Sequence, residues 1–249
     1  MNSTKNLFGL LGKGITYSFS EKYFTNKFIK ENLPYQYKNI DVDDIGGLFD
    51  FLANNIEYLQ GFNITIPYKE EILPYLDEID TVAEEIGAVN CVKILEDNRL
   101  KGFNTDAFGF EKSFRPLLKP MHKKALIFGT GGASKAIAFT LDKLHIPFVF
   151  VSRNMQESIF SYQDITKEIL EEYTILINTT PLGTKGKMEN QSLEIPYEYI
   201  TKNHLLYDLV YNPLETLFLK KCKKGITKNG LEMLELQADK SWEIWTENK

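Results

Sequence analysis

The chain has 249 residues, of which 43% are hydrophobic, 25% charged and 13% aromatic, a composition that excludes a disordered or collagen-like protein. Acidic residues outnumber Lys and Arg by 34 to 29, and the resulting net charge of −5 argues against a nucleic-acid-binding surface. No apolar run approaches the roughly 18 residues that suggest a membrane span. Polar first residues and two cysteines far apart in sequence argue against secretion, so we expect a cytoplasmic protein.

The first part of the chain alternates short apolar runs with helical patterns. Strands are predicted at 8–12, 37–42, 61–66, 87–95 and 99–104, and helices at 20–32, 45–54 and 82–86. Pro67 follows the third of these strands, and proline is favoured at the first position of a helix. We therefore expect an α/β domain, with Lys69 in a first helical turn and Asn90 on a strand.

The second part of the chain opens with a strand, a glycine turn, a helix and a second strand. These elements are predicted at 125–128, 129–132, 133–144 and 148–151, and they form one βαβ unit. Further parallel strands are expected at 175–177 and 205–207, and a last helix at 231–245. The fold class is therefore α/β, with a substrate domain over 1–105, to which 231–249 returns, and a Rossmann-type domain with a mostly parallel sheet over 106–230.

The glycine turn carries two of the three glycines of the dinucleotide-binding fingerprint, with Ser134 at the third position. Such glycines permit a tight turn and let phosphate oxygens approach the backbone at a helix N-terminus. Arg153 ends the next strand, where NAD-binding folds usually place an acid, and it would bind a 2′-phosphate. This pattern favours NADP. Two structural interpretations remain open: the glycine segment could be only a turn between strand and helix, and Arg153 could be only a solvated residue at a strand end.

Several short segments follow one another along nearly the whole chain: YSFS (17–20), NITIPYK (63–69), GAVN (87–90), NTDAFG (104–109), GTGGA (129–133), NTTPLG (178–183), YDLVYNP (207–213) and NGLEML (229–234), with Gln237. Together they resemble the shikimate dehydrogenase family. The resemblance implies reversible, NADP-dependent reduction of 3-dehydroshikimate to shikimate, a step of aromatic amino-acid biosynthesis, without a metal. The three histidines are scattered with no ligand spacing.

The resemblance also implies which residues form the site. Lys69 and Asp106 would be the catalytic pair, since an ammonium can stabilise and protonate the oxygen that becomes negative during hydride addition. Residues expected to bind substrate are Ser18 and Ser20 at its carboxylate, and Thr65, Lys69, Asn90, Asp106, Tyr211 and Gln237 around its ring. Residues expected to bind NADP are Gly129, Thr130, Gly131, Gly132, Ala133, Ser152, Arg153, Asn154, Thr179 and Gly230. Asn63 is expected to be structural.

Several of these residues also have ordinary structural explanations. Ser18 and Glu21 have the spacing of a capping box, and Ser20 could be an N-cap. A lysine in a charged helix is usually solvated, and Asp106 could belong to a turn or cap a helix. The sequence also departs from the family at Tyr17, where His is usual, at Glu21, where Pro is usual, and at Glu157, which replaces a basic residue. The last departure bears on the choice between NADP and NAD.

Three other functions remain open from the sequence. A relative acting on quinate, or on both acids and with NAD, is the nearest alternative. A non-catalytic NADP-binding sensor is a second, but it would not need both Lys69 and Asp106. A methylene-tetrahydrofolate enzyme would not explain the two serines or the NTD segment. We expect a small-molecule substrate, no nucleic-acid or membrane partner, and a monomer or homodimer.

Overall fold

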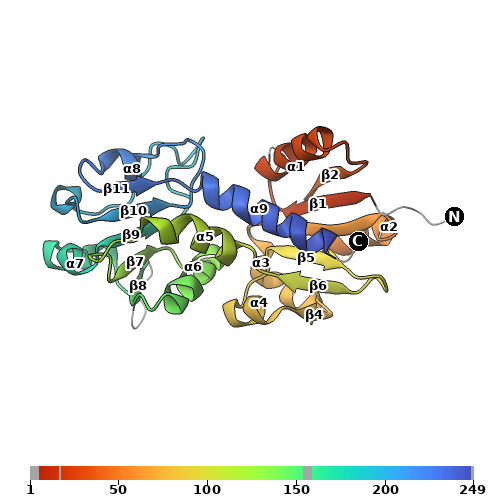
Figure 1. The fold of residues 1–249 in the computed structure, drawn as a ribbon, viewed down its shortest axis with the longest axis horizontal. Helices are drawn as coiled ribbons and strands as arrows, with labels where there is room; N and C mark the ends of the chain where they lie inside the picture. Colours follow the sequence, from red (N-terminus) through yellow and green to blue (C-terminus); the bar gives the residue numbers. More distant parts are fainter. Residues whose placement is uncertain (1–5, 17, 154–158, 248–249) are drawn as a thin grey trace. The chain divides into compact units, whose positions relative to one another are not determined.

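The computed structural model describes residues 6–16, 18–153 and 159–247 (Figure 1). The chain divides into two compact units, the first formed by Met1–Thr105 with Ala238–Lys249 and the second by Asp106–Gln237. The division falls inside the last helix, α9 (Leu231–Thr246), whereas the sequence places the return to the first domain at residue 231. Among the described residues, no helix is long and apolar enough to cross a lipid bilayer.

The first unit contains, within its described residues, a six-stranded sheet in the order β2-β1-β3-β5-β6-β4 (Figure 1). Its strands are β1 (Leu7–Gly12), β2 (Gln36–Asp41), β3 (Leu59–Ile64), β4 (Glu78–Ile79), β5 (Cys91–Ile94) and β6 (Leu100–Phe103). β1 runs parallel to β2 and β3, while β5 is antiparallel to both β3 and β6. The carboxyl ends of β1, β3 and β6 and the amino end of β5 therefore share one edge.

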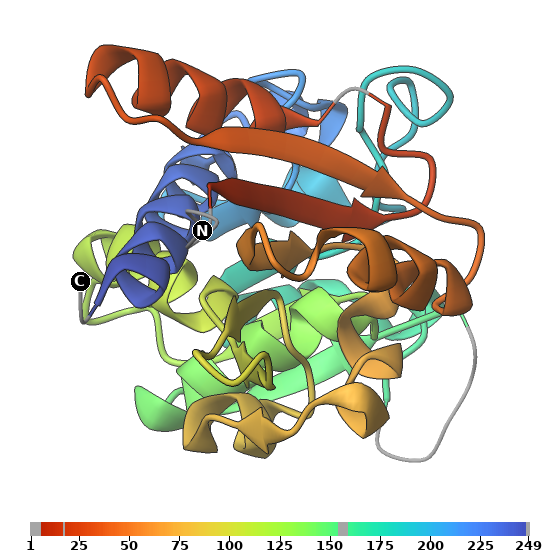
Figure 2. The same cartoon turned by 90° about the vertical axis from the view of Figure 1, so that its right-hand side faces the viewer.

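Alternating side chains of β1 enter two different cores, as expected for a strand covered on both faces. Leu7 and Leu11 pack into the core that also contains residues of α2 (Gly46–Asn55), α3 (Tyr68–Glu71) and α4 (Thr81–Ile86). Phe8 and Leu10 pack against α1 (Phe19–Lys30) and the end of α9. In Figure 2, α1 lies along β2.

Two local predictions for this unit are corrected by the structure. Pro67 is the N-cap of α3 and not its first residue, and its peptide bond with Ile66 is cis. The strand expected at 87–95 begins only at Cys91, because Gly87 ends α4 in a left-handed conformation with φ 67°. Asn90 therefore lies in the connection just before β5.

The second unit contains a five-stranded parallel sheet, in the order β11-β10-β9-β7-β8, in the part of the chain that the structure describes. Its strands are β7 (Ala125–Phe128), β8 (Phe148–Val151), β9 (Ile175–Asn178), β10 (Leu205–Asp208) and β11 (Ile226–Lys228). Its helices are α5 (Asp106–Phe114), α6 (Gly132–Lys143), α7 (Lys167–Glu172) and α8 (Leu217–Lys221). Among the described residues of both units, the short 3₁₀ turns are η1 (Leu73–Tyr75), η2 (Arg115–Leu117), η3 (Tyr162–Asp164) and η4 (Tyr197–Tyr199).

This parallel sheet is also covered on both faces, which is usual for sheets built from βαβ units. Ala125 and Ile127 of β7 pack with residues of α5 and α6, which lie side by side in Figure 1. Leu126 and Phe128 pack on the other face with residues of α7 and α8. All four β7 side chains are buried, which explains why the sequence of this strand is a continuous apolar run up to the glycine turn.

Candidate active site

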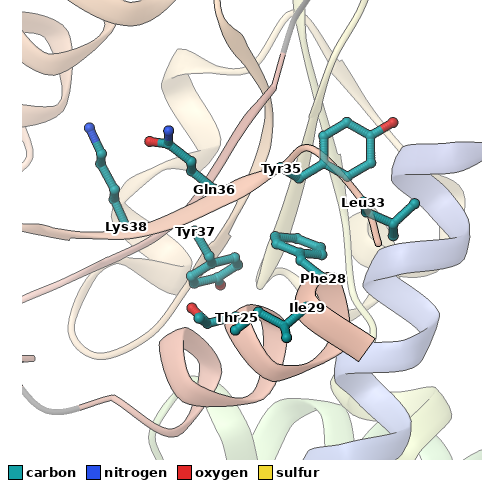
Figure 3. A pocket seen from close by; sticks show the side chains of 8 residues that line it. All are labelled: Thr25, Phe28, Ile29, Leu33, Tyr35, Gln36, Tyr37 and Lys38. Carbon is teal, nitrogen blue, oxygen red and sulfur yellow. The ribbon is translucent and has the colours of Figure 1, made fainter. Parts of the chain in front are cut away.

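A pocket of about 300 Å³ opens beside α1 and the start of β2 (Figure 3). Its lining residues are Thr25, Phe28, Ile29, Leu33, Tyr35, Gln36, Tyr37 and Lys38. This pocket lies at the amino end of β2, whereas the residues expected to bind substrate follow the carboxyl ends of β1 and β3. Ligands of open α/β sheets bind beyond the carboxyl ends of the strands, so this pocket is not the candidate site.

Thr65 and Asn90 are held next to each other at the shared edge of the first sheet. The Thr65 N–H donates to the Leu11 carbonyl at 2.8 Å, and the Ile64 N–H donates to the Asn90 carbonyl at 2.8 Å. A Cβ at Gly12 would lie 2.6 Å from the Thr65 methyl carbon, so glycine at the end of β1 leaves the space that Thr65 fills.

Lys69 is brought to the same edge by the short helix α3. The Thr65 carbonyl accepts from the Tyr68 N–H at 3.0 Å, and the Lys69 carbonyl accepts from the Val89 N–H at 2.8 Å. Val89 directly precedes Asn90, so Thr65, Lys69 and Asn90 form one cluster. The Lys69 residue is partly buried, unlike its exposed neighbour Glu70.

The Asn90 side chain forms a two-point contact with Thr105. Its Oδ1 accepts from the Thr105 N–H at 2.7 Å, and its Nδ2 donates to the Thr105 Oγ1 at 3.0 Å. Both residues are buried. Asp106 follows directly as the first residue of α5, also buried, and so begins the second unit.

Ser18 is the N-cap of α1, and its Oγ accepts from the Glu21 N–H at 3.1 Å. Only this half of the expected capping box forms, because the Glu21 carboxylate accepts instead from Asn39 Nδ2 at 2.8 Å. The Ser18 hydroxyl donates to the Asn39 Oδ1 at 2.7 Å. Ser20 lies inside α1 and is buried.

In the second unit, Gly129 ends β7 in a conformation that requires glycine. Its φ is +109°, and a Cβ there would lie 2.6 Å from the Thr179 Oγ1. The Thr179 N–H and hydroxyl both donate to the Phe128 carbonyl, at 2.9 and 2.8 Å. The turn after β7 and the end of β9 are therefore fixed against each other.

Gly131 and Gly132 start α6, with Gly131 as the N-cap. A Cβ at Gly131 would meet no described atom within 4 Å, so no contact within the described chain explains this glycine. Ser134, at the third fingerprint position, is buried, and its hydroxyl donates to the Gly131 carbonyl at 2.6 Å. Thr130 is exposed at the tip of the turn and Ala133 lies in the first turn of α6.

The end of β8 carries Ser152 and Arg153, which follow Val151. The Ser152 N–H donates to the Phe160 carbonyl at 2.9 Å, and Arg153 is exposed. Asn154 and Glu157 lie outside the described residues, as does Tyr17 beside Ser18.

A buried carboxylate joins the ends of β9 and β10. Asp208 Oδ1 accepts from Asn178 Nδ2 at 2.9 Å and from the Val210 N–H at 3.0 Å, and its Oδ2 accepts from the Thr216 hydroxyl at 2.5 Å. Burial raises the pKa of Asp208 to about 6, and the three donors act in the opposite direction. Asn178 precedes Thr179, so Asp208 holds the segment that is expected to line the cofactor.

The remaining expected residues lie elsewhere in this unit. Tyr211 is partly buried in the turn after β10, three residues beyond its end, and burial raises its pKa. Gly230 precedes α9, and a Cβ there would overlap the Leu209 carbonyl oxygen, so close backbone packing already explains this glycine. Gln237 is buried in α9, and its Nε2 donates to the Leu234 carbonyl at 2.9 Å.

The structure thus gathers Ser18, Ser20, Thr65, Lys69 and Asn90 in the first unit. The second unit holds Asp106, Tyr211, Gln237 and the residues expected to bind cofactor. Sequence reasoning did not identify Tyr37, Asn39, Asp208 or Ser241 as parts of these arrangements. Within the described ranges, no group of three or more His, Cys, Asp or Glu side chains could hold a metal ion.

Comparison with known proteins identifies the family. Residues 10–92 match the family described as shikimate dehydrogenase substrate binding domain. The NADP(+) shikimate dehydrogenase of Methanococcus maripaludis is 39% identical over 99% of this chain and 94% of its own length.

Solved structures agree as well. A shikimate dehydrogenase in complex with NADP+ has a TM-score of 0.84 and 32% identity, covering 97% of this chain and 90% of the other. The Thermus thermophilus enzyme in complex with NADP(H) and shikimate also has a TM-score of 0.84, with 30% identity over 97% of this chain and 93% of its own. The expected α/β fold class and the family resemblance are confirmed: the chain belongs to the shikimate dehydrogenase family.

Proposed function

We propose that this protein catalyses the reversible, NADP-dependent reduction of 3-dehydroshikimate to shikimate, as an oxidoreductase of aromatic amino-acid biosynthesis. The observation that carries the proposal is the cluster at the edge of the first sheet. There, hydroxyl, carboxamide and ammonium groups from Thr65, Asn90 and Lys69 come from three separate segments. Such a set suits a small acid with several hydroxyl groups.

The second unit has features that fit NADP. Gly131 leaves open backbone at the N-terminus of α6, a helix of 12 residues, where a pyrophosphate could approach the N–H groups. Arg153 at the end of β8 stands where an NAD-binding fold would carry an acid, and a guanidinium favours a 2′-phosphate. When bound, NADPH supplies the hydride. Thr179 and Gly230 would lie along the cofactor.

Lys69 and Asp106 are assigned the acid–base roles. Reduction of the ketone places negative charge on its oxygen, and the Lys69 ammonium stabilises that charge and donates a proton to the oxygen. The Asp106 carboxylate orients the ammonium and favours its charged form. In the oxidation of shikimate the same pair takes up the hydroxyl proton.

The other polar residues bind and orient the substrate. Ser18 and Ser20, at the start of α1, donate hydroxyl hydrogens to the substrate carboxylate, for which Ser18 turns its hydroxyl hydrogen away from Asn39. The positive end of the helix dipole also favours the carboxylate. Thr65, Asn90, Tyr211 and Gln237 contact the ring hydroxyls. These contacts fix the ring so that one carbon faces the nicotinamide.

We also propose that the protein acts in the cytoplasm, as a monomer or homodimer, on small molecules alone. Cys91 and Cys222 are both free thiols. Burial raises the pKa of Cys91 to about 12, which keeps this thiol protonated and unreactive. Free thiols of this kind agree with a reducing compartment.

The test is a set of steady-state assays of the purified chain with shikimate and quinate, each with NADP and NAD. We expect the highest kcat/KM for shikimate with NADP. Lys69→Ala and Asp106→Asn should each lower kcat by about 10²–10⁴-fold, the usual contribution of general acid–base groups. Lys30→Ala, which removes an exposed lysine at the far end of α1, should leave kcat unchanged.

Each other outcome selects a different function. Faster turnover of quinate, or of NAD, would establish the relative with altered specificity. NADP binding without turnover of either acid would establish a sensor. Near-full turnover by Lys69→Ala would remove that residue from the mechanism.

A further inference from the structure

A chain of buried hydrogen bonds runs through the first unit behind the substrate cluster. The Tyr37 hydroxyl donates to the Asn63 Oδ1 at 3.0 Å. The Asn63 Nδ2 donates to the Ser241 hydroxyl at 2.8 Å and to the Asn90 carbonyl at 3.2 Å. Ser241 Oγ then lies 3.2 Å from Thr105 Oγ1, the same hydroxyl that contacts the Asn90 side chain.

This network, defined here as Tyr37, Asn63, Ser241, Thr105 and Asn90, joins five elements or connections that are distant in sequence. One of its ends, Asn90, is assigned to the substrate. Tyr37, Asn63 and Ser241 come from β2, β3 and α9 and have no assigned role in the reaction. Ser241 is fully buried, and Tyr37 is 5% exposed and lines the pocket beside α1, which is not the candidate site.

We propose that Tyr37 and Ser241 are positioning residues for the substrate: they fix the Asn63 carboxamide from both ends and thereby set the position of Asn90. This inference rests on the proposed function, because it takes Asn90 as a substrate ligand.

The orientation of the Asn63 amide is determined by its neighbours. The Tyr37 hydroxyl donates to the oxygen end, and the Ser241 and Asn90 oxygens accept from the nitrogen end. The ring of Tyr37 is itself immobilised, since it stacks on Phe24 at 4.7 Å between centroids and 11° between planes. Buried polar groups that lose a partner are costly, so the whole chain of bonds acts as one unit.

Removing the Tyr37 hydroxyl should therefore disturb Asn90. The Asn63 oxygen loses its donor, which relaxes the contact of the Asn63 amide with the Asn90 carbonyl. The Asn90 side chain is affected through Ser241 and Thr105. NADP binding depends on the second unit and should not respond.

The experiment compares Tyr37→Phe and Ser241→Ala with Tyr207→Phe. Tyr207 is a buried tyrosine of the second unit whose hydroxyl lies 2.7 Å from the Ser113 hydroxyl, so its substitution removes the same atom from another core. We expect Tyr37→Phe to raise the KM for shikimate by about three- to tenfold, as for one or two lost hydrogen bonds. The KM for NADP and the kcat at saturation should change less than about twofold.

Ser241→Ala should raise the KM for shikimate less than Tyr37→Phe does. The double variant should raise this KM by less than the product of the two single effects, because both substitutions act through Asn63. Tyr207→Phe should leave the KM for shikimate unchanged even if it lowers the melting temperature. A KM for shikimate within twofold of wild type in both first-unit variants would overturn the proposal. So would equal rises in the KM values for shikimate and NADP.

The proposed function fails separately. Its failure would appear as absent shikimate oxidation by the wild-type chain, whereas the network is judged only from ratios between variants and wild type. If the wild type binds shikimate without turnover, the same ratios are read from dissociation constants measured by calorimetry, with the same expected and opposing outcomes.

Discussion

The two sheets hold their polar site residues in different ways. In the first unit, Tyr37, Asn63, Thr105 and Ser241 are brought together from segments up to about two hundred residues apart, and they bond through side chains. In the second unit, Asp208 accepts hydrogen bonds from Val210 and Thr216, which follow it in the chain, and from Asn178 at the end of the adjacent strand. The site in the second unit is therefore a property of a local motif, whereas the site in the first depends on the complete fold of its unit.

This difference can be tested because the two units have different optical signals. The protein has two tryptophans, Trp242 and Trp245, and both lie in the part of α9 that belongs to the first unit. Tryptophan fluorescence therefore follows the first unit, while far-ultraviolet circular dichroism follows both.

The largest effect is expected from Gly230→Ala in the second unit. The new methyl group would overlap the Leu209 carbonyl oxygen, and a backbone atom cannot move aside as a side chain does. We expect a loss of about 3 kcal/mol or more, seen in urea titrations by circular dichroism.

Gly12→Ala is the matched change in the first unit, because the atoms nearest to its methyl group would be side-chain atoms of Thr65 and Ile15. It should fold, with a fluorescence transition close to wild type, and raise the KM for shikimate by displacing Thr65. Equal losses of stability in the two glycine variants would contradict this comparison.

A second test uses the buried carboxylate of the second unit. Because the pKa of Asp208 is about 6 when folded and its ordinary value is 3.8, the native state binds a proton that the unfolded chain releases. Its contribution to stability is therefore complete below about pH 4 and is lost as the pH rises through about 6, by roughly 3 kcal/mol. Asp208→Asn should abolish this dependence, since Thr216 can turn its hydroxyl to accept from the new amide.

The measurement is the difference between wild type and Asp208→Asn in unfolding free energy by circular dichroism from about pH 4 to pH 7. Taking the difference cancels the opposite contribution of buried His122 and His204, whose pKa values are lowered chiefly by burial. A wild-type curve parallel to that of the variant would show that Asp208 does not titrate in this range.

The contrast between short-range contacts in the second unit and long-range contacts in the first also explains how much could be predicted from the sequence. The strand, glycine turn and helix from Ala125 to Lys143 were predicted to within a residue, because continuous apolar runs and glycines are local signals. β4 and β11 were missed, since strands of two and three residues have no periodicity. Ser241 lies on a helix whose pattern was clear, but its partner Asn63 is 178 residues away, and no spacing in the sequence relates the two.

A third test concerns the cofactor. Arg153 is exposed at the end of β8, and it is not one of the residues that pair β8 with β7. Arg153→Ala should therefore leave both unfolding transitions unchanged and raise the KM for NADP about tenfold, as for one charge-assisted hydrogen bond. The KM for NAD should stay the same. A KM for NADP that does not rise would remove Arg153 from the 2′-phosphate site.

The smallest effect is expected at Ser18, where a structural and a functional role coincide. Ser18→Ala removes the N-cap of α1 and should cost about 1 kcal/mol in the fluorescence transition. Ser18→Asn keeps a good cap but replaces the hydroxyl. If the hydroxyl binds the substrate carboxylate, both variants should raise the KM for shikimate, although only the alanine variant loses stability. If the KM for shikimate rises only in the alanine variant, which loses stability, Ser18 acts only as the helix cap. In that case, Ser20 is the one of the two serines that binds the carboxylate.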